Sequence, residues 1–282
     1  MTARSYRFSV SEFTTYPWTF EQDVAVYEQL GVDGIEVCEF KLDPARISRQ
    51  LAMIPQHHLA ISSVQPAVRT LFPSLSQPEP LHIPDRMERF RATIESFGDA
   101  ASGVPFVTNT GIPPHGNIEE VIDAAVREYR DLADFARDRG ARIALEPLNA
   151  SIMNIETAIW TVEQGMRLIE AVGRPNFGLC LDFWNVWQNA DLEEAIRNAG
   201  DRIFIVQVSD WRTPRSFQDR LIVGQGDILF PPLLRAVDEA GYRGFYELEI
   251  FSGDVPNSLW KGDLQQVITE SRRGLDKAWQ ST

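Results

Sequence analysis

Four oxygen-bearing side chains stand at the ends of apolar, strand-like runs in the second half of the chain: Glu146, Asp182, Gln207 and Glu249. Carboxylates held close together repel one another and resist the loss of water, and a divalent cation relieves both costs. Oxygen ligands suit Mg²⁺ or Mn²⁺ better than an ion that prefers thiolates. If the fold brings these four side chains together, the sequence therefore predicts a site for one divalent metal ion.

The alternation of large and small residues predicts which face each run presents. In the run 176–182, large apolar side chains alternate with small ones, and Asp182 falls in the small set. In a closed barrel the crowded interior takes the small set, and the helices cover the large one. The same alternation places Gln207 and Ile203 inside the barrel and Phe204 outside it.

A further carboxylate, Glu247, falls on the interior face two positions before Glu249. An unpaired carboxylate is costly to bury. Arg7 holds an interior position on the first strand, which would close the barrel against the last one. We therefore expect Arg7 and Glu247 to form a buried ion pair.

The elements that must position these side chains repeat along the whole chain. Each unit is a short apolar run rich in β-forming residues, followed by an amphipathic stretch that ends at Gly or Pro. The expected strands are 6–12, 34–39, 60–65, 105–110, 142–146, 176–182, 203–209 and 244–250. Between them, Thr19 with Gln22 and Asp191 with Glu194 fit capping boxes at helix starts, and Gly173 stands where a helix should end.

Strands that alternate with helices indicate a parallel sheet, either open and doubly wound or closed into a barrel. No Gly-x-Gly-x-x-Gly follows the first strand, which disfavours a dinucleotide-binding open sheet. The repeat and the polar strand ends favour an α/β fold, the (β/α)₈ TIM barrel. Such barrels use about 250 residues as one domain, so residues 1–282 are expected to form a single domain. Residues 65–84, with five prolines, are expected to form a long loop over the barrel mouth.

Composition bounds the partners and the compartment. The formal charge of −13, from 27 basic and 40 acidic residues, disfavours a nucleic-acid partner, which requires a basic surface. No long apolar run and no signal-like N-terminus are present, so we expect no membrane partner and a cytoplasmic protein. Cys38 and Cys180 lie in apolar segments and are expected to be buried free thiols. The sequence leaves a homo-oligomer open.

The motifs around these residues resemble one family. They are Glu146-Pro147-Leu148-Asn149, Asp182-Phe183-Trp184-Asn185, Gln207-Val208-Ser209-Asp210, and Gly241-Tyr242-Arg243-Gly244 leading to Glu249. With these motifs the sequence resembles the sugar phosphate isomerase/epimerase superfamily, the xylose isomerase-like TIM barrels, which include the ketose 3-epimerases. The resemblance is clearest over residues 141–254.

In the ketose epimerases the metal is held by a Glu after strand 5, an Asp after strand 6, a His after strand 7 and a Glu after strand 8. The resemblance carries these roles onto Glu146, Asp182, Gln207 and Glu249. It also makes the two glutamates the acid/base pair, and it implies a substrate-binding role for Arg220, which precedes a Gly-x-Gly turn.

The sequence departs from the family pattern at three positions. Asn185 and Gln207 stand where histidines are usual, and Ile152 replaces a second glutamate that often follows the strand-5 one. A glutamine still offers an oxygen to a metal, but a neutral amide is a weaker ligand for a transition metal than imidazole.

The resemblance implies a metal-dependent sugar or sugar phosphate isomerase/epimerase that removes a proton α to a carbonyl through an enediolate. Glu146 and Glu249 would move the proton between them. Asn185 and Asp210 would bind hydroxyl groups of a small carbohydrate substrate, and Arg220 would anchor a distal hydroxyl or phosphate.

Other interpretations stay open. Trp184 and Trp211 suit stacking on the C–H faces of a sugar, and they equally suit packing beneath long loops. If a leaving group lies β to the carbonyl, the same intermediate expels it, which would make a keto-sugar dehydratase or keto-glycoside lyase. The missing histidines also leave open a non-catalytic sugar-binding barrel. An endonuclease is disfavoured, because its trinuclear zinc site requires several histidines.

Overall fold

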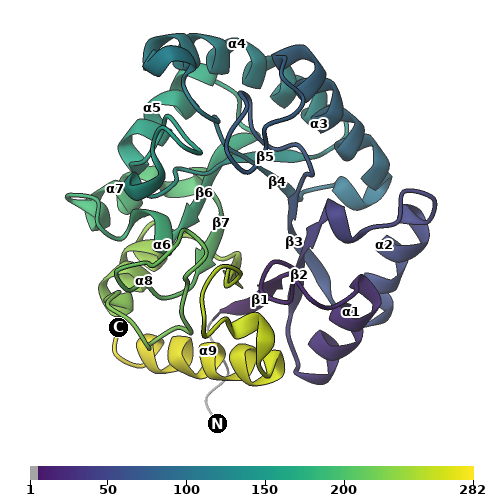
Figure 1. Ribbon diagram of the computed structural model, residues 1–282, viewed down its shortest axis with the longest axis vertical. Helices are drawn as coiled ribbons and strands as arrows, with labels where there is room; N and C mark the ends of the chain where they lie inside the picture. Colours follow the sequence, from purple (N-terminus) through teal and green to yellow (C-terminus); the bar gives the residue numbers. More distant parts are fainter. Residues whose placement is uncertain (1–5) are drawn as a thin grey trace.

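The computed structural model describes residues 6–282, which form a closed barrel of parallel strands surrounded by helices (Figure 1). The strands pair in chain order, and β1 closes the barrel against β8. Their bounds are β1 Arg7–Ser11, β2 Gly34–Cys38, β3 Ala60–Gln65, β4 Pro105–Thr108, β5 Arg142–Leu145, β6 Phe177–Asp182, β7 Ile203–Val208 and β8 Phe245–Leu248. The expected (β/α)₈ TIM barrel is confirmed, and each expected strand is present.

Helices cover the outside of the barrel, as Figure 1 shows. They are α1 Phe20–Gln29, α2 Ile47–Gln56, α3 Ile83–Phe97, α4 Ile118–Arg137, α5 Val162–Val172, α6 Phe183–Val186, α7 Leu192–Ala199, α8 Phe230–Glu239 and α9 Leu264–Trp279. Short 3₁₀ helices are η1 Glu39–Lys41, η2 Gly98–Ala101, η3 Pro114–Gly116, η4 Ala150–Ile152, η5 Gly200–Arg202 and η6 Leu259–Lys261. Within residues 6–282, none of the helices is both long and apolar enough to cross a membrane.

The predicted helix ends are partly confirmed. Thr19 and Gln22 form the expected capping box at the start of α1, and Gly173 ends α5 in the left-handed conformation. The capping box predicted for Asp191 and Glu194 is wrong. Asp191 has a φ of 50° and makes no side-chain cap, because this backbone lies outside the extended region in which a capping side chain reaches back to the first turn.

The predicted alternation holds in β6 and fails at the start of β7. Cys180 belongs to the cluster inside the barrel, as expected for the small set. In β7, however, Phe204 joins the inner cluster, whereas Ile203 packs in the outer core. The pairing of β6 with β7 shifts by one residue at this point, and such a bulge reverses the faces on one side of it. Gly178 makes room for Phe204, since a Cβ there would lie 2.6 Å from its ring.

Both cysteines, Cys38 and Cys180, are buried free thiols, as expected. The proline-rich segment expected as a loop between β3 and α3 also lies where predicted. Arg69, Thr70 and Gln77 of this segment line the barrel mouth. Buried Arg86, on α3, donates from Nε to the carbonyl of Thr70 at 2.7 Å and so fastens the loop to the helix behind it.

Candidate active site

A cavity of about 470 Å³ opens at the carboxyl ends of the strands. Glu146, Glu249, Arg220, Asn185 and Trp184 are among the residues that line it. In TIM barrels the loops at this end of the strands build the active site, and the volume lies within the range of cavities that hold small molecules. The cavity is therefore the candidate active site.

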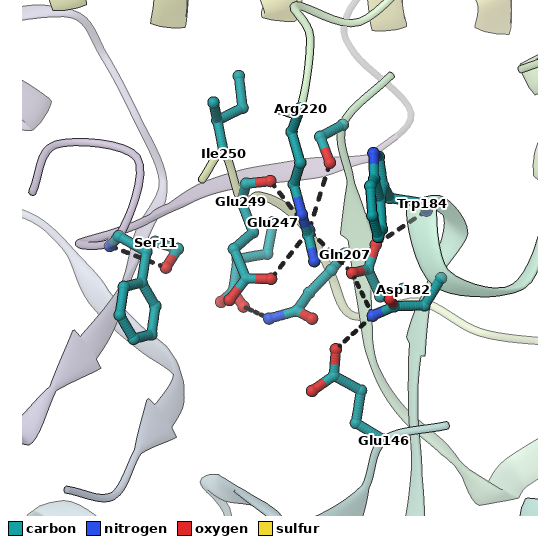
Figure 2. A network of polar contacts seen from close by, with 12 residues as sticks. Ser11, Glu146, Asp182, Trp184, Gln207, Arg220, Glu247, Glu249 and Ile250 are labelled. Atoms are coloured by element: carbon teal, nitrogen blue, oxygen red, sulfur yellow. Dashed lines mark hydrogen bonds and ion pairs between the residues drawn. The ribbon is translucent and has the colours of Figure 1, made fainter. Parts of the chain in front are cut away.

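Three carboxylates converge at the floor of this cavity. One ligand oxygen of each of Glu146, Asp182 and Glu249 lies within 4.8 Å of the other two, and all three residues are buried. Asp182 is the last residue of β6, while Glu146 and Glu249 come directly after β5 and β8. Because parallel strands all end at one mouth of the barrel, strand position and interior parity together bring these side chains to one place (Figure 2).

The side chain of Gln207, the predicted fourth ligand, points away from the three carboxylates and deeper into the barrel. Its Nε2 donates to Glu247 at 3.0 Å and to Glu36 at 3.3 Å, and its Oε1 accepts from the thiol of Cys180 at 3.3 Å. The register explains this orientation, since Gln207 on β7 pairs with Glu247 on β8 and not with Glu249. Figure 2 shows the Gln207 amide beside Glu247. The prediction that Gln207 binds the metal therefore finds no support in its contacts.

The predicted ion pair between Arg7 and Glu247 is wrong. Arg7 is exposed, and its guanidinium lies over the ring of Phe245 at 4.0 Å. The Glu247 carboxylate instead accepts from the hydroxyls of Ser62 at 2.5 Å and Ser63 at 2.9 Å, in addition to Gln207. Neutral donors from β3 and β7 thus satisfy the buried carboxylate for which the sequence predicts a cation.

Arg220 supplies positive charge at the floor. Its Nη1 lies 2.8 Å from Oδ2 of Asp182 and 3.0 Å from Oε2 of Glu249. The guanidinium carbon lies 4.8 Å from the Trp184 ring centroid and 4.9 Å from that of Phe251. Arg220 thus compensates two of the three carboxylates, while its Nε is buried without a hydrogen-bond partner among the described residues.

Asn185 links Glu146, the third carboxylate, to Asp182 and so to Arg220. It stands at a position where the family usually has histidine. Its Nδ2 donates at 2.8 Å to Glu146 Oε1 and at 2.8 Å to Asp182 Oδ2, and its Oδ1 accepts from the backbone of Asn149 at 3.0 Å. All three hydrogen bonds are internal to the protein. Asn185 therefore fixes the separation of Glu146 and Asp182.

The electrostatics of the floor favour an additional cation. Burial, and after it the neighbouring Asp182 carboxylate, raises the pKa of Glu146 to about 7. Burial also raises the pKa of Glu249 well above its usual value, against the opposing charge of Arg220. One guanidinium does not balance three buried carboxylates, and their oxygens, within 4.8 Å of one another, lie near the separation of about 4.2 Å that opposite ligands of one Mg²⁺ ion span at about 2.1 Å each. The donor set therefore fits a divalent metal.

Two residues predicted to bind substrate lie elsewhere. Asp210 Oδ2 accepts from the backbone N–H groups of Gly224 at 2.8 Å and Gly226 at 2.9 Å, and its Oδ1 accepts from Ile228. Trp211 packs on Trp187, with ring centroids 4.9 Å apart. Neither Asp210 nor Trp211 lines the cavity, because the strand-7 loop folds back on itself at this point.

The site contains further residues that the sequence does not single out. Asn109 donates from Nδ2 to Glu146 Oε2 at 3.0 Å, and Gln65 donates from Nε2 to Glu249 Oε1 at 3.4 Å. Arg69 lines the cavity, and its guanidinium has no hydrogen-bond or ion-pair partner among residues 6–282. The position of Gln65 at the end of an expected strand was a usable signal, whereas nothing in the sequence distinguishes Arg69 from other loop arginines.

Comparisons with known proteins identify the family. The family model of the xylose isomerase-like TIM barrel matches residues 24–277, and the chain belongs to this family. The inosose isomerase of Halalkalibacterium halodurans is 25% identical over 240 residues, which cover 82% of each protein. The L-ribulose 3-epimerase of Methylomonas sp. (strain DH-1) is 30% identical over 133 residues, covering 46% of this chain and 43% of that protein.

A solved structure shows the same fold. The crystal structure of the IOLI protein with a binding zinc atom is similar to this chain with a TM-score of 0.79 and 23% sequence identity. The match covers 96% of this chain and 97% of the other. The barrel is thus shared over its whole length, including the strands that carry the candidate site.

Proposed function

We propose that the protein is a metal-dependent isomerase or epimerase of a small carbohydrate, phosphorylated or not, that transfers a proton next to a carbonyl group. The observation that carries this proposal is the convergence of Glu146, Asp182 and Glu249 at the barrel mouth. The similarity to an inosose isomerase and to an L-ribulose 3-epimerase supports the same class of reaction.

The three carboxylates would hold one divalent cation, and Gln207 is left out of the proposed ligand set. When bound, the cation polarises the substrate carbonyl and stabilises the negative charge that develops on its oxygen. The zinc atom in the similar IOLI structure supports a divalent metal. The oxygen donors of this chain suit Mn²⁺ or Mg²⁺.

Glu146 and Glu249 would share the proton transfer. They follow β5 and β8, with β6 and β7 between them, so they reach the substrate from two sides. A carboxylate oxygen of one accepts the proton from the carbon next to the carbonyl. The carboxyl group of the other returns a proton, either to the opposite face of that carbon or to the neighbouring carbon. The first outcome is epimerisation and the second is isomerisation.

Arg220, Trp184 and Asn185 would orient the substrate and its acid/base pair. The unpartnered Nε of Arg220 is a buried donor that a substrate oxygen would satisfy. Trp184 lines the cavity beside this guanidinium and offers a ring face to sugar C–H groups. Asn185 holds the Glu146 carboxylate through its amide.

Two measurements test the proposal. The protein is loaded with Mn²⁺ or Mg²⁺ and then dialysed. Metal analysis should find bound ion, at one equivalent per chain or less. The loaded protein should then exchange an α-proton of at least one ketose, inosose or ketose phosphate for solvent deuterium. Release of water or an aglycone in place of an isomer would instead identify a lyase, and the absence of exchange with every keto-sugar would contradict proton abstraction.

A matched variant controls for the loss of a carboxylate as such. Glu146→Gln and Glu249→Gln should each abolish exchange without unfolding the barrel. Glu119→Gln makes the same chemical change at an exposed position in the first turn of α4 and should leave the exchange rate unchanged.

A further inference from the structure

One side of the active-site cavity is built from aromatic rings. Phe13, Tyr16, Phe40 and Phe251 all line it, and we call this set the aromatic wall. Phe13 and Tyr16 follow β1, Phe40 lies in η1 after β2, and Phe251 follows β8. Three adjacent strands of the closed barrel therefore contribute to one continuous surface.

The rings form a connected series that leads away from the carboxylates. The ring centroids of Phe251 and Phe13 are 4.5 Å apart, those of Phe13 and Phe40 are 5.3 Å apart, and those of Phe40 and Tyr16 are 5.5 Å apart. Phe251 begins the series at the floor, where the guanidinium of Arg220 lies 4.9 Å from its ring centroid. The aromatic wall is thus continuous with the proposed metal site.

The outer end of the aromatic wall is open to solvent. Phe13 is 9% exposed, whereas Phe40 is 46% and Tyr16 is 50% exposed. Large apolar side chains that gather in an exposed patch commonly mark a binding surface. The Trp260 ring also stacks on Tyr16, with ring centroids 4.7 Å apart and an interplanar angle of 15°.

The floor and the aromatic wall call for different chemical groups. The floor presents carboxylates, amides and a guanidinium, which suit hydroxyl and carbonyl oxygens. The aromatic wall presents ring faces that gain most from a flat apolar partner. A sugar ring seated on the floor would leave the exposed part of the aromatic wall in contact with water.

We propose that the aromatic wall is a subsite for an aryl group attached to the sugar, so that the preferred substrate is a keto-sugar with an aromatic substituent. This inference rests on the proposed function, because the sugar part is taken to occupy the carboxylate floor. Arg69 supports this occupant. Its guanidinium carbon lies 5.6 Å from the Phe13 ring centroid, and a phenolic oxygen on the aryl group would satisfy its free donors.

Binding measurements separate this inference from the proposed function. Isothermal titration of the metal-loaded protein would compare phenyl and methyl β-D-glucosides, which lack the keto group and therefore do not react during the titration. The phenyl compound should bind about tenfold more tightly, since an aromatic pair contributes up to about 1.5 kcal/mol beyond area burial. Tight binding of the phenyl glucoside, with no α-proton exchange of any keto-sugar, would contradict the proposed reaction and leave the subsite supported. Equal affinity for the two glucosides would refute the subsite, whatever the exchange rate.

Variants of the outer rings localise the effect. Tyr16→Ala and Phe40→Ala combined should reduce the preference for the phenyl compound to about twofold, with the methyl compound bound as before. Tyr16→Phe should retain the preference. Phe135→Ala, which removes a partly buried ring from α4, should also retain it. If the double variant instead changes the sedimentation coefficient and keeps the ligand preference, the aromatic wall is an interface between copies of this chain.

Discussion

Arg220 Nη1 lies 2.8 Å from Oδ2 of Asp182, in a part of the barrel where both residues are buried. The same nitrogen contacts Glu249, so a single guanidinium serves two carboxylates that the proposed metal would also share. Burial raises the pKa of Asp182, and the Arg220 charge opposes that shift. Arg220 therefore stabilises the metal-free site.

Replacement of Arg220 by glutamine should destabilise the metal-free protein by about 3–5 kcal/mol, because it leaves buried carboxylates without their cation. Urea unfolding of the chelator-treated protein measures this loss. Added Mn²⁺ should raise the melting temperature of Arg220→Gln by more than that of the parent protein, since the metal then supplies the missing charge.

The matched control for this prediction is Arg197→Gln. Arg197 pairs with Glu193 and Glu239 on the exposed surface, where ion pairs contribute at most about 1 kcal/mol. If both variants unfold at the same urea concentration, Arg220 does not stabilise the carboxylate floor.

The role of Gln207 can be decided by comparing two substitutions. Gln207→Leu should cost roughly 1–3 kcal/mol, because Glu36 and Glu247 lose a buried donor. Its Mn²⁺ affinity should stay within about twofold of the parent value, whereas Asp182→Asn should lower that affinity at least about tenfold. Titration with Mn²⁺, followed by electron paramagnetic resonance, gives both affinities. A tenfold loss in Gln207→Leu would restore Gln207 to the ligand set.

The sequence was sufficient to predict the carboxylate floor. Strand runs with clear alternation place Glu146, Asp182 and Glu249 at interior positions, and a closed parallel barrel then brings their ends together. Local pattern and global topology agree at these positions, so no tertiary contact had to be known.

The sequence was insufficient to predict which of several neighbouring groups a buried side chain contacts. Gln207 has the expected parity, but the stagger of β7 against β8 places it beside Glu247. The bulge opposite Leu179 and Cys180, which exchanges the faces of Ile203 and Phe204, has no signature in the alternation. The partners of a buried group depend on register and loop path, and neither is encoded in the spacing along one strand.

The metal-free protein should lose stability as the pH rises from about 4.5 to about 7. Burial raises the pKa of Glu146 to about 7 in the folded state, so the folded protein holds a proton that the unfolded chain releases near pH 4.3. In this window the native state binds more protons than the unfolded state, and the stability therefore falls as pH increases. The effect of this one residue is roughly 4 kcal/mol, because the two pKa values differ by about 2.7 and each pKa unit corresponds to about 1.4 kcal/mol.

Urea unfolding in the presence of a chelator, at pH 5, 6 and 7, measures this dependence. Glu146→Gln removes the titrating group and should give a flatter profile over the same range. Added Mn²⁺ should stabilise the parent protein more at pH 7 than at pH 5, since the ion competes with the proton for the carboxylate. A profile that rises with pH in the metal-free parent would contradict the assigned shift.

Asp210 should hold the loop after β7 in its folded conformation. Its carboxylate accepts four backbone N–H groups, from Trp211, Gly224, Gly226 and Ile228. Asp210→Ala leaves these donors without a partner and should cost roughly 2 kcal/mol or more. The loop also contains exposed arginine, so trypsin should cleave it faster in the variant. Asp227→Ala alters an exposed carboxylate of the same loop and should change neither property. If Asp210 binds substrate directly, as the sequence predicted, its removal would raise KM while stability and resistance to trypsin stay at the parent values.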